Sequence, residues 1–193
     1  MARPLEFDKN VALEKAMDVF WEKGFEATSL QDLIDTMGLS KSSFYQAFGG
    51  KLELFSTALN HYTDSMAANM ATRLEATPSG IEFIRNTFME IVAQAPTDLG
   101  MKGCFLMNTA SEFAQRDTEI AALTKGGVKK FESVFFKAIE KSQKAGEISS
   151  EKDAHSLAYF LVCNMSGLKT MVKAGAKRRQ LRAVVDTLLA SLN

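Results

Sequence analysis

The stretch TSLQDLIDTMGLSKSSFYQAFGGKLELF, residues 28–55, decides the fold of the first part of the chain. It contains two short segments with helical apolar spacing, joined by Met-Gly-Leu-Ser. Thr28 and Gln31 have the spacing of a capping box, which predicts a helix that begins there and stops at Gly38. Ser40 is a suitable N-cap for a second helix over residues 41–48, which the glycine pair at 49–50 ends.

The second of these helices has an apolar side and a polar side. On a helical wheel the apolar side holds Phe44, Ala47 and Phe48, whereas the other holds Lys41, Ser42, Tyr45 and Gln46, with Ser43 at the margin. At 1.5 Å per residue the helix is about 12 Å long, which suits a DNA major groove about 12 Å wide. We therefore interpret the pair as a helix-turn-helix whose second helix faces DNA. The alternative is a solvated cap on a helical bundle.

The polar residue types fit contacts to DNA. Lys41 can donate to guanine or phosphate, and Gln46 can pair with adenine. Tyr45 and the serines can reach phosphates or bases. Lys51 begins the next helix, where a helix N-terminus also favours a phosphate.

Charge opposes this interpretation. The chain has 23 basic and 23 acidic residues, and residues 1–55 carry six cations against nine anions, a net charge of −3. Because a DNA-binding domain normally shows a basic footprint, the acids must lie away from the groove, as Glu14, Asp18 and Glu22 of the first helix would allow. We also expect modest non-specific affinity and a shallow dependence on salt.

Apolar spacing and helix stop signals predict an all-α protein of about nine helices. The expected helices span residues 8–23, 28–38, 41–48, 51–76, a segment bracketed by Pro78 and Pro96, 104–115, 118–146, 151–174 and 177–192, with PTDLGMKG as a loop. We expect a three-helix DNA-binding domain over residues 1–55 and a larger effector-binding and dimerisation domain over residues 56–193.

The N-terminal 60 residues resemble the TetR/AcrR family of bacterial transcriptional regulators. The resemblance rests on FWEKGFEATSL, on DLIDTMGLSKSSFYQAFGGKLELF, and on the aromatic pair Phe44-Tyr45 followed by Phe48 and Lys51. It implies a homodimer that reads a palindromic operator in double-stranded DNA, usually as a repressor, and whose C-terminal body binds a small effector.

The resemblance also implies roles for individual residues. Thr28 or Ser29, Ser40, Tyr45 and Lys51 would contact phosphates, and Lys41, Ser42, Ser43 and Gln46 would lie in the groove. Arg3 and Pro4 are similar to the basic arm that some members insert in the minor groove. Ser42 stands where many members have glycine or proline, so base contacts at that position do not transfer.

The body offers a dimer interface and an effector pocket. The run over residues 154–165, in the helix expected at 151–174, is apolar on nearly all sides, which predicts that this helix and the last one pair with a second subunit; the alternative is the core of a monomer. Adaptable methionines suit a pocket for apolar ligands, although each of them could equally fill the core. The candidate pocket residues are Met66, Met70, Met89, Met107 and Met165. A shift of the helix over residues 51–76 would carry the effector's signal to the head.

Cys104 is a candidate thiol sensor. It opens a helix beside Lys102, and a helix N-terminus and a cation both favour a thiolate. The segment MKGCFLMNTASEF is similar to the equivalent one in repressors that sense electrophiles and oxidants, although Gly-Cys also occurs in relatives that simply pack a small side chain there. Cys163, in the middle of an apolar run, is expected to be inert core.

Other classes of protein have little support in the sequence. His61, His155 and the two cysteines offer a conceivable Cys-His pair, but no nucleotide-binding, hydrolase or metal-ligand motif appears, so we expect no catalysis, cofactor or metal. A helical interaction module without DNA binding would leave the polar face of residues 41–48 unexplained. The two cysteines, the absence of a signal-like N-terminus and a longest apolar run of about seven residues predict a cytoplasmic protein without a membrane span.

Overall fold

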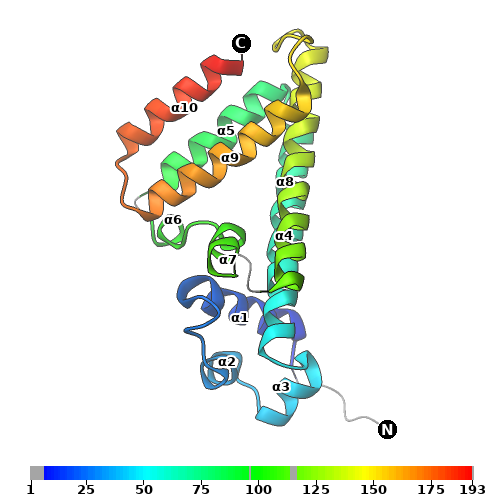
Figure 1. Cartoon of the computed structure of the whole chain (residues 1–193), viewed down its shortest axis with the longest axis vertical. Helices are drawn as coiled ribbons and strands as arrows, with labels where there is room; N and C mark the ends of the chain where they lie inside the picture. Colours follow the sequence, from blue (N-terminus) through cyan, green and yellow to red (C-terminus); the bar gives the residue numbers. More distant parts are fainter. Residues whose placement is uncertain (1–6, 96, 114–116, 193) are drawn as a thin grey trace.

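The computed structural model describes residues 7–95, 97–113 and 117–192, which form ten α-helices and no strand (Figure 1). The helices are α1 Lys9–Lys23, α2 Leu30–Met37, α3 Lys41–Phe48, α4 Lys51–Ala76, α5 Gly80–Gln94, α6 Asp98–Lys102, α7 Phe105–Phe113, α8 Thr118–Lys144, α9 Ala154–Lys173 and α10 Arg178–Leu192. The all-α prediction is confirmed. The extra helix is α6, in the segment expected to be a loop, where the Thr97 hydroxyl caps five residues by accepting from Gly100 N–H.

Helices α1, α2 and α3 form a head that packs around the start of α4 (Figure 1). Its centre is aromatic, because Phe20, Phe44 and Phe55 are almost completely buried. The rings of Phe20 and Phe55 meet edge to face with centroids 5.0 Å apart, which joins α1 to α4. The head is thus fixed to α4 by its own core.

The start of α2 differs from the prediction by one residue. Ser29 is the N-cap, and its hydroxyl accepts from Asp32 N–H while the Asp32 carboxylate accepts from Ser29 N–H. Thr28 is fully buried and its hydroxyl donates to the Gly24 carbonyl at 2.6 Å. The capping box assigned to Thr28 and Gln31 is therefore wrong. The Thr28 side chain is buried and hydrogen-bonded to Gly24, so the neighbouring Ser29 caps the helix instead.

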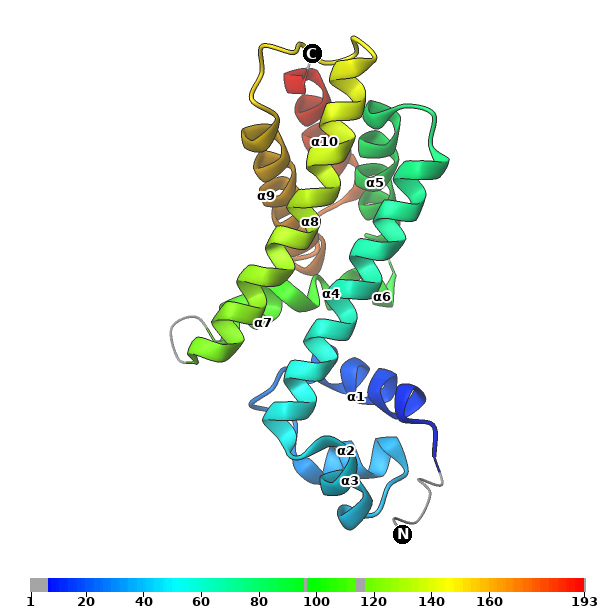
Figure 2. The same ribbon diagram turned by 90° about the vertical axis from the view of Figure 1, so that its right-hand side faces the viewer.

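Two long helices connect the head with the rest of the molecule. Figure 2 shows α4 rising from the head beside α8, with α5, α9 and α10 behind them. Gly127 of α8 allows a close approach, since a Cβ there would lie 2.8 Å from both Thr63 Cγ2 of α4 and Leu106 Cδ1 of α7. The boundary expected at residue 55 falls within α4, so the head and the body share one continuous helix.

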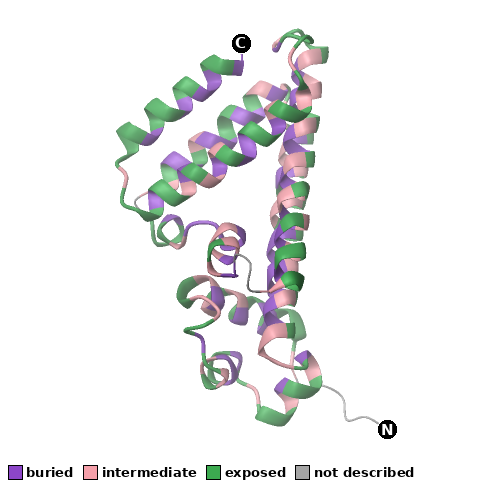
Figure 3. Cartoon of the chain, viewed as in Figure 1, coloured by how far each residue is buried: buried purple, intermediate pink, exposed green. Residues whose placement is uncertain are grey.

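The C-terminal helices are covered differently from what the apolar pattern suggested. The stripe of α10 is buried against α5 and α9 of the same chain, apart from the exposed Val184. Cys163 of α9 is exposed, so its assignment to inert core is wrong. Figure 3 shows exposed positions along α9 and α10. Sequence periodicity marks a residue as apolar but does not say whether its own chain covers it.

Candidate DNA-binding surface and effector cavity

The polar side of α3 is exposed as predicted. Lys41, Ser42, Tyr45 and Gln46 are exposed and Ser43 is half-buried, while Phe44 and Phe48 point into the head core. The helix lies at the end of the molecule farthest from α5, α9 and α10 (Figure 1). The four exposed polar side chains of α3 therefore form a solvent-accessible surface along one short helix.

Local hydrogen bonds and ring packing fix the first turn of α3 and the side chain of Tyr45. The Ser40 hydroxyl accepts from Ser43 N–H at 3.1 Å and lies 2.8 Å from the Ser43 hydroxyl, which holds the first turn. The ring of Tyr45, 47% exposed, meets Phe44 edge to face at 5.5 Å. Within the described residues, the Lys41, Tyr45 and Gln46 side chains have no hydrogen-bond partner, so their polar atoms are available to another molecule.

A candidate phosphate contact flanks α3 at the start of α4. Gly50 is the N-cap of α4 and supplies no side chain to its first backbone N–H groups. Lys51 lies there with its ammonium 4.2 Å from the centre of the Phe25 ring. A cation and free N–H groups at a helix N-terminus together favour an anion.

The structure distinguishes between Thr28 and Ser29, the two alternatives for a phosphate contact near α2. Ser29 is exposed at the N-cap of α2, whereas the buried Thr28 cannot reach DNA in this conformation. The structure thus favours Ser29 of the two alternatives. Arg3 lies outside the described residues.

The acidic residues of α1 face the body and not the α3 surface. Asp18 forms an ion pair with Lys102 of α6, with 3.2 Å between Oδ1 and Nζ. Glu14 and Asp18 also line a cavity between head and body. Glu22 lines a second depression beside α7. In α2, Asp32 pairs with Lys23 at 3.1 Å. The three acids of α1 thus lie away from α3, whereas Asp32 and Asp35 belong to α2 and Glu53 to the first turn of α4.

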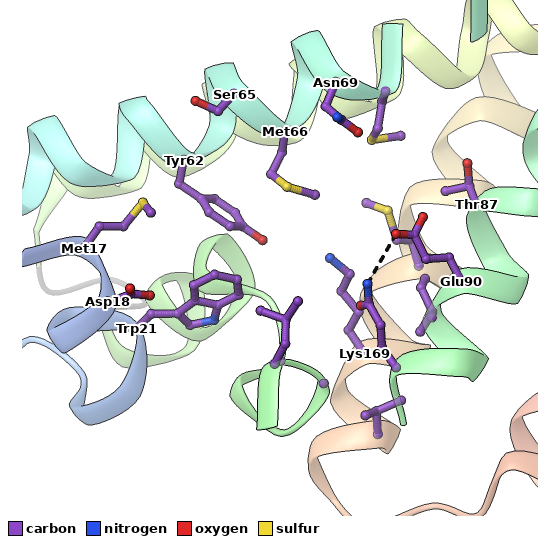
Figure 4. Close-up of a pocket in the computed structure, with 18 of the residues that line it drawn as sticks. Met17, Asp18, Trp21, Tyr62, Ser65, Met66, Asn69, Thr87, Glu90 and Lys169 are labelled. Atoms are coloured by element: carbon purple, nitrogen blue, oxygen red, sulfur yellow. Dashed lines mark hydrogen bonds between the residues drawn. The ribbon is translucent and has the colours of Figure 1, made fainter. Parts of the chain in front are cut away.

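A cavity of about 550 Å³ lies where α1 meets α4, α5, α6 and α9 (Figure 4). Its apolar walls include Met17 and Trp21 from α1 and Tyr62 from α4. Of the five predicted methionines, Met66, Met70 and Met165 line it. Met89 and Met107 do not; Met89 packs half-buried against the core and Met107 lines the second depression. The contribution of α1 was not predicted.

The polar groups of this cavity fall into paired and unpaired sets. Arg73 pairs with Glu90 at 2.6 Å, and Gln94 also donates to Glu90. Lys169 of α9 points into the cavity towards Tyr62 and Met66 and has no partner among the described residues (Figure 4). Two buried atoms at the wall, Trp21 Nε1 and Thr87 Oγ1, also lack a hydrogen-bond partner in this part of the chain. The unpaired groups are thus chiefly donors.

Cys104 lies behind the cavity wall and is 4% exposed. The Tyr62 hydroxyl donates to its Sγ at 3.7 Å. Burial raises the pKa of Tyr62 well above its ordinary value, and the neighbouring Cys104 raises it further. Lys102, expected beside the thiol, instead pairs with Asp18, so the predicted cationic surroundings of the thiol are not found.

Glu112 of α7 forms a direct link between body and head. Its carboxylate accepts from Phe25 N–H at 3.0 Å and from Glu26 N–H at 2.8 Å, both in the turn between α1 and α2. Gly24 begins this turn with φ of 84°, and a Cβ there would lie 3.1 Å from Glu112 Oε2. No local sequence pattern indicates a contact between residues so far apart in the chain.

Comparisons with known proteins agree with this architecture. Residues 12–58 match the model described as bacterial regulatory proteins, tetR family, and residues 80–188 match tetracyclin repressor-like, C-terminal domain. The chain belongs to the TetR family. It is a DNA-binding transcriptional regulator, as the family resemblance implied.

Individual TetR relatives match over almost their whole length. An uncharacterized HTH-type transcriptional regulator, YezE of Bacillus subtilis, is 34% identical over 100% of both chains. The HTH-type transcriptional repressor ComR of Escherichia coli is 31% identical over 97% of this chain and 90% of its own. A cysteine mutant of the TetR family regulator CifR, complexed with 26-base-pair operator DNA, has a TM-score of 0.83 and 29% identity, with 100% of both chains covered.

These relatives are named as regulators, so the enzyme alternative is not supported. In the parts of this TetR-family chain that the structure describes, no cluster of three or more His, Cys, Asp or Glu side chains is arranged to hold a metal ion. No helix of those same parts is long and apolar enough to cross a membrane.

Proposed function

We propose that this TetR-family regulator is a homodimeric repressor, acting in the cytoplasm, that a small molecule in the α1–α4–α9 cavity releases from a palindromic operator. The observation that carries DNA recognition is the exposed polar side of α3, which stands on a buried aromatic base. The operator-bound CifR mutant, similar over its full length, supports the same use of the head.

The proposed contacts divide by position. Lys41, Ser42, Ser43 and Gln46 would face base edges in the major groove. Ser29, Ser40, Tyr45 and Lys51 would contact phosphates on either side of it, and Arg3 would reach the minor groove. Because Ser29 and Ser40 already cap helices, their DNA contacts would add to those caps instead of replacing them.

Selection of bound duplexes from a random DNA pool tests the proposal, with the wild type and Tyr45→Ala in parallel. Recovery of a palindrome by the wild type, weakened in the variant, is the expected result. Failure to enrich any duplex at low salt, where phosphate contacts are strongest, would contradict DNA recognition by α3. The recovered duplex then serves as the probe for every later binding experiment.

The dimer surface proposed over residues 151–192 is centred on α9. Tyr159, Phe160, Cys163 and Met171 are exposed there, and Val184 extends the surface onto α10. Exposed large apolar side chains that gather on one side of a chain favour an interface. Since the remaining stripe of α10 is buried in its own subunit, α10 contributes less than the sequence suggested.

Release would begin in the cavity, because head and body both form its walls. A ligand that displaces Met17 or Trp21 acts directly on α1, and one that displaces Tyr62 or Met66 acts on α4. The Glu112 link and the Lys102–Asp18 pair then transmit movement of α7 and α6 to the head. A change in the separation of two heads would spoil their fit to half-sites one DNA turn apart, about 34–36 Å.

Modification of Cys104 is a second candidate trigger, favoured by the Tyr62–Cys104 hydrogen bond that joins the thiol to the cavity wall. Any group added to Sγ would displace the Tyr62 hydroxyl. Alkylation of the protein bound to its operator tests this, with Cys104→Ser and Cys163→Ser as controls. The thiol trigger requires release that Cys104→Ser abolishes and Cys163→Ser preserves; equal release from all three proteins, or none, would exclude it.

A further inference from the structure

The unpaired groups of the cavity indicate the chemistry of its ligand. Lysine is an ammonium with three donors and no acceptor, and an indole N–H is a donor alone. Trp21, Thr87 and Lys169 all belong to the cavity lining. The unpaired atoms Trp21 Nε1 and Thr87 Oγ1 are sealed from solvent, whereas the half-buried Lys169 has no partner within the described residues and is open to the cavity. A ligand that supplies an acceptor to this ammonium therefore gains more than one that does not.

The acidic groups of the lining do not cancel Lys169. Glu90 is paired with Arg73, and Asp18 with Lys102. Glu14, the third acid of the lining, is exposed on α1, whereas Lys169 belongs to α9. After these pairings, Glu14 and Lys169 are the carboxylate and the ammonium of the described lining without a partner, and the ammonium of Lys169 points into the interior (Figure 4).

Apolar surface surrounds the unpaired ammonium of Lys169. The Trp21 and Tyr62 rings meet edge to face at 5.0 Å and form one wall, and Met66, Met70 and Met165 form much of the rest. Aromatic and thioether side chains accept apolar groups of varied shape. The volume of about 550 Å³ is within the range of small-molecule sites.

We infer that the cavity binds an apolar molecule carrying one acidic group, a carboxylate or a sulfonate, whose anion pairs with Lys169 while its apolar part lies against Trp21 and Tyr62. The inference rests on the proposed role of this cavity as the effector site. Such a ligand joins α9 of the body to α1 of the head, because Lys169 and Trp21 lie on opposite walls (Figure 4).

A matched pair of fluorescent dyes tests the inference. Anilinonaphthalene sulfonate and phenylnaphthylamine share their ring system and differ in the sulfonate. Trp21 is the one tryptophan of the chain, so energy transfer from it reports a dye bound near this cavity. Displacement of phenylnaphthylamine by decanoate, compared with decylamine, repeats the comparison with non-aromatic ligands.

Three variants separate the ammonium from other effects. Lys169→Met should weaken the sulfonate dye about tenfold and leave phenylnaphthylamine unchanged, and Lys169→Arg should restore most of the loss. Lys173→Met, one turn further along α9 and outside this cavity lining, should bind both dyes as the wild type does. Decanoate should displace the neutral dye at lower concentration than decylamine.

The inference fails if Lys169→Met weakens both dyes alike or neither, if no dye receives energy from Trp21, or if decylamine displaces better than decanoate. The selected operator duplex separates this failure from that of the proposed function. Lys169-dependent binding of acids without operator release would keep the ligand class and refute the effector role. A protein that binds acids but selects no duplex would refute the proposed operator recognition alone.

Discussion

At the scale of single residues, the hydroxyl and the ring of Tyr45 have different roles, which one substitution can distinguish. The ring packs against Phe44, while the hydroxyl has no partner among the described residues. Tyr45→Phe should keep the stability of the protein within about 0.5 kcal/mol and weaken operator binding about 3- to 10-fold through loss of one phosphate hydrogen bond. Anisotropy titration of the selected duplex measures this, with Ser150→Ala, which removes an exposed hydroxyl of the loop between α8 and α9, as the control; unchanged affinity of Tyr45→Phe would show that the hydroxyl does not contact DNA.

Asp32 makes the head sensitive to acid. Hydrogen bonds from Ser29, and then the contact with Lys23, lower the pKa of Asp32 from 3.8 to about 2. Because the pKa in the folded state is depressed, this carboxylate stabilises the protein above about pH 4, and the contribution disappears as the pH falls through 2. Thermal unfolding should therefore separate the wild type from Asp32→Asn at neutral pH, with a difference that shrinks between about pH 4 and 2. A constant difference, or the same behaviour in Asp35→Asn, would contradict it.

Residue-level prediction from the sequence succeeded where one helix alone decides the answer. The two sides of α3 follow from its periodicity, and the structure reproduces them residue by residue. The assignment of Thr28 as N-cap failed because Thr28 and Ser29 both suit that position, and burial of the Thr28 side chain leaves the cap to Ser29. The partners of Lys102 and Glu112 could not be predicted, because a contact between residues more than 80 positions apart leaves no periodic pattern in the sequence.

At the scale of elements, the link from α7 to the α1–α2 turn should control how firmly the head is held. Glu112→Ala leaves Phe25 N–H and Glu26 N–H without their acceptor and should cost about 1–3 kcal/mol of stability. We expect hydrogen exchange to rise in this turn and the ligand to lose part of its effect on operator binding. Glu75→Ala, an exposed residue of α4, is the control. Protection of the turn equal to that of the wild type would show that α7 does not hold the head.

Helix α6 and the position of α1 beside the cavity could not be predicted from the sequence. The five residues of α6 are too few for a periodic pattern, yet α6 carries Lys102 to the head and Gly100 to the cavity. The participation of α1 in the cavity arises from the way α1 crosses beneath the body, which no local signal encodes. Met66, Met70 and Met165 line the cavity because they lie on the sides of α4 and α9 that form its walls, whereas Met89 lies on another side of α5.

At the scale of the whole molecule, the exposed side of α9 should hold two subunits together. Phe160→Glu places a charge in the proposed interface and should convert the dimer to a monomer that keeps its helical content. Operator affinity should fall about 100-fold or more, since each half-site then binds alone. Light scattering and operator titration measure the two effects, with Met101→Glu, another exposed apolar position, as the control. A variant that stays dimeric would move the interface away from α9.

The continuity of α4 has a consequence for the operators that the protein can use. A helix of 26 residues is about 39 Å long, and because it belongs to the head core and to the body it joins the two without a break. In the ligand-free state of the proposed dimer, the two heads would then be held at one distance and one rotational setting. A palindrome with one extra base pair at its centre would turn the second half-site by roughly 35° away from its head, given about 10.5 base pairs per turn. The spacing between half-sites would thus be as much a part of the recognised sequence as the bases that α3 touches.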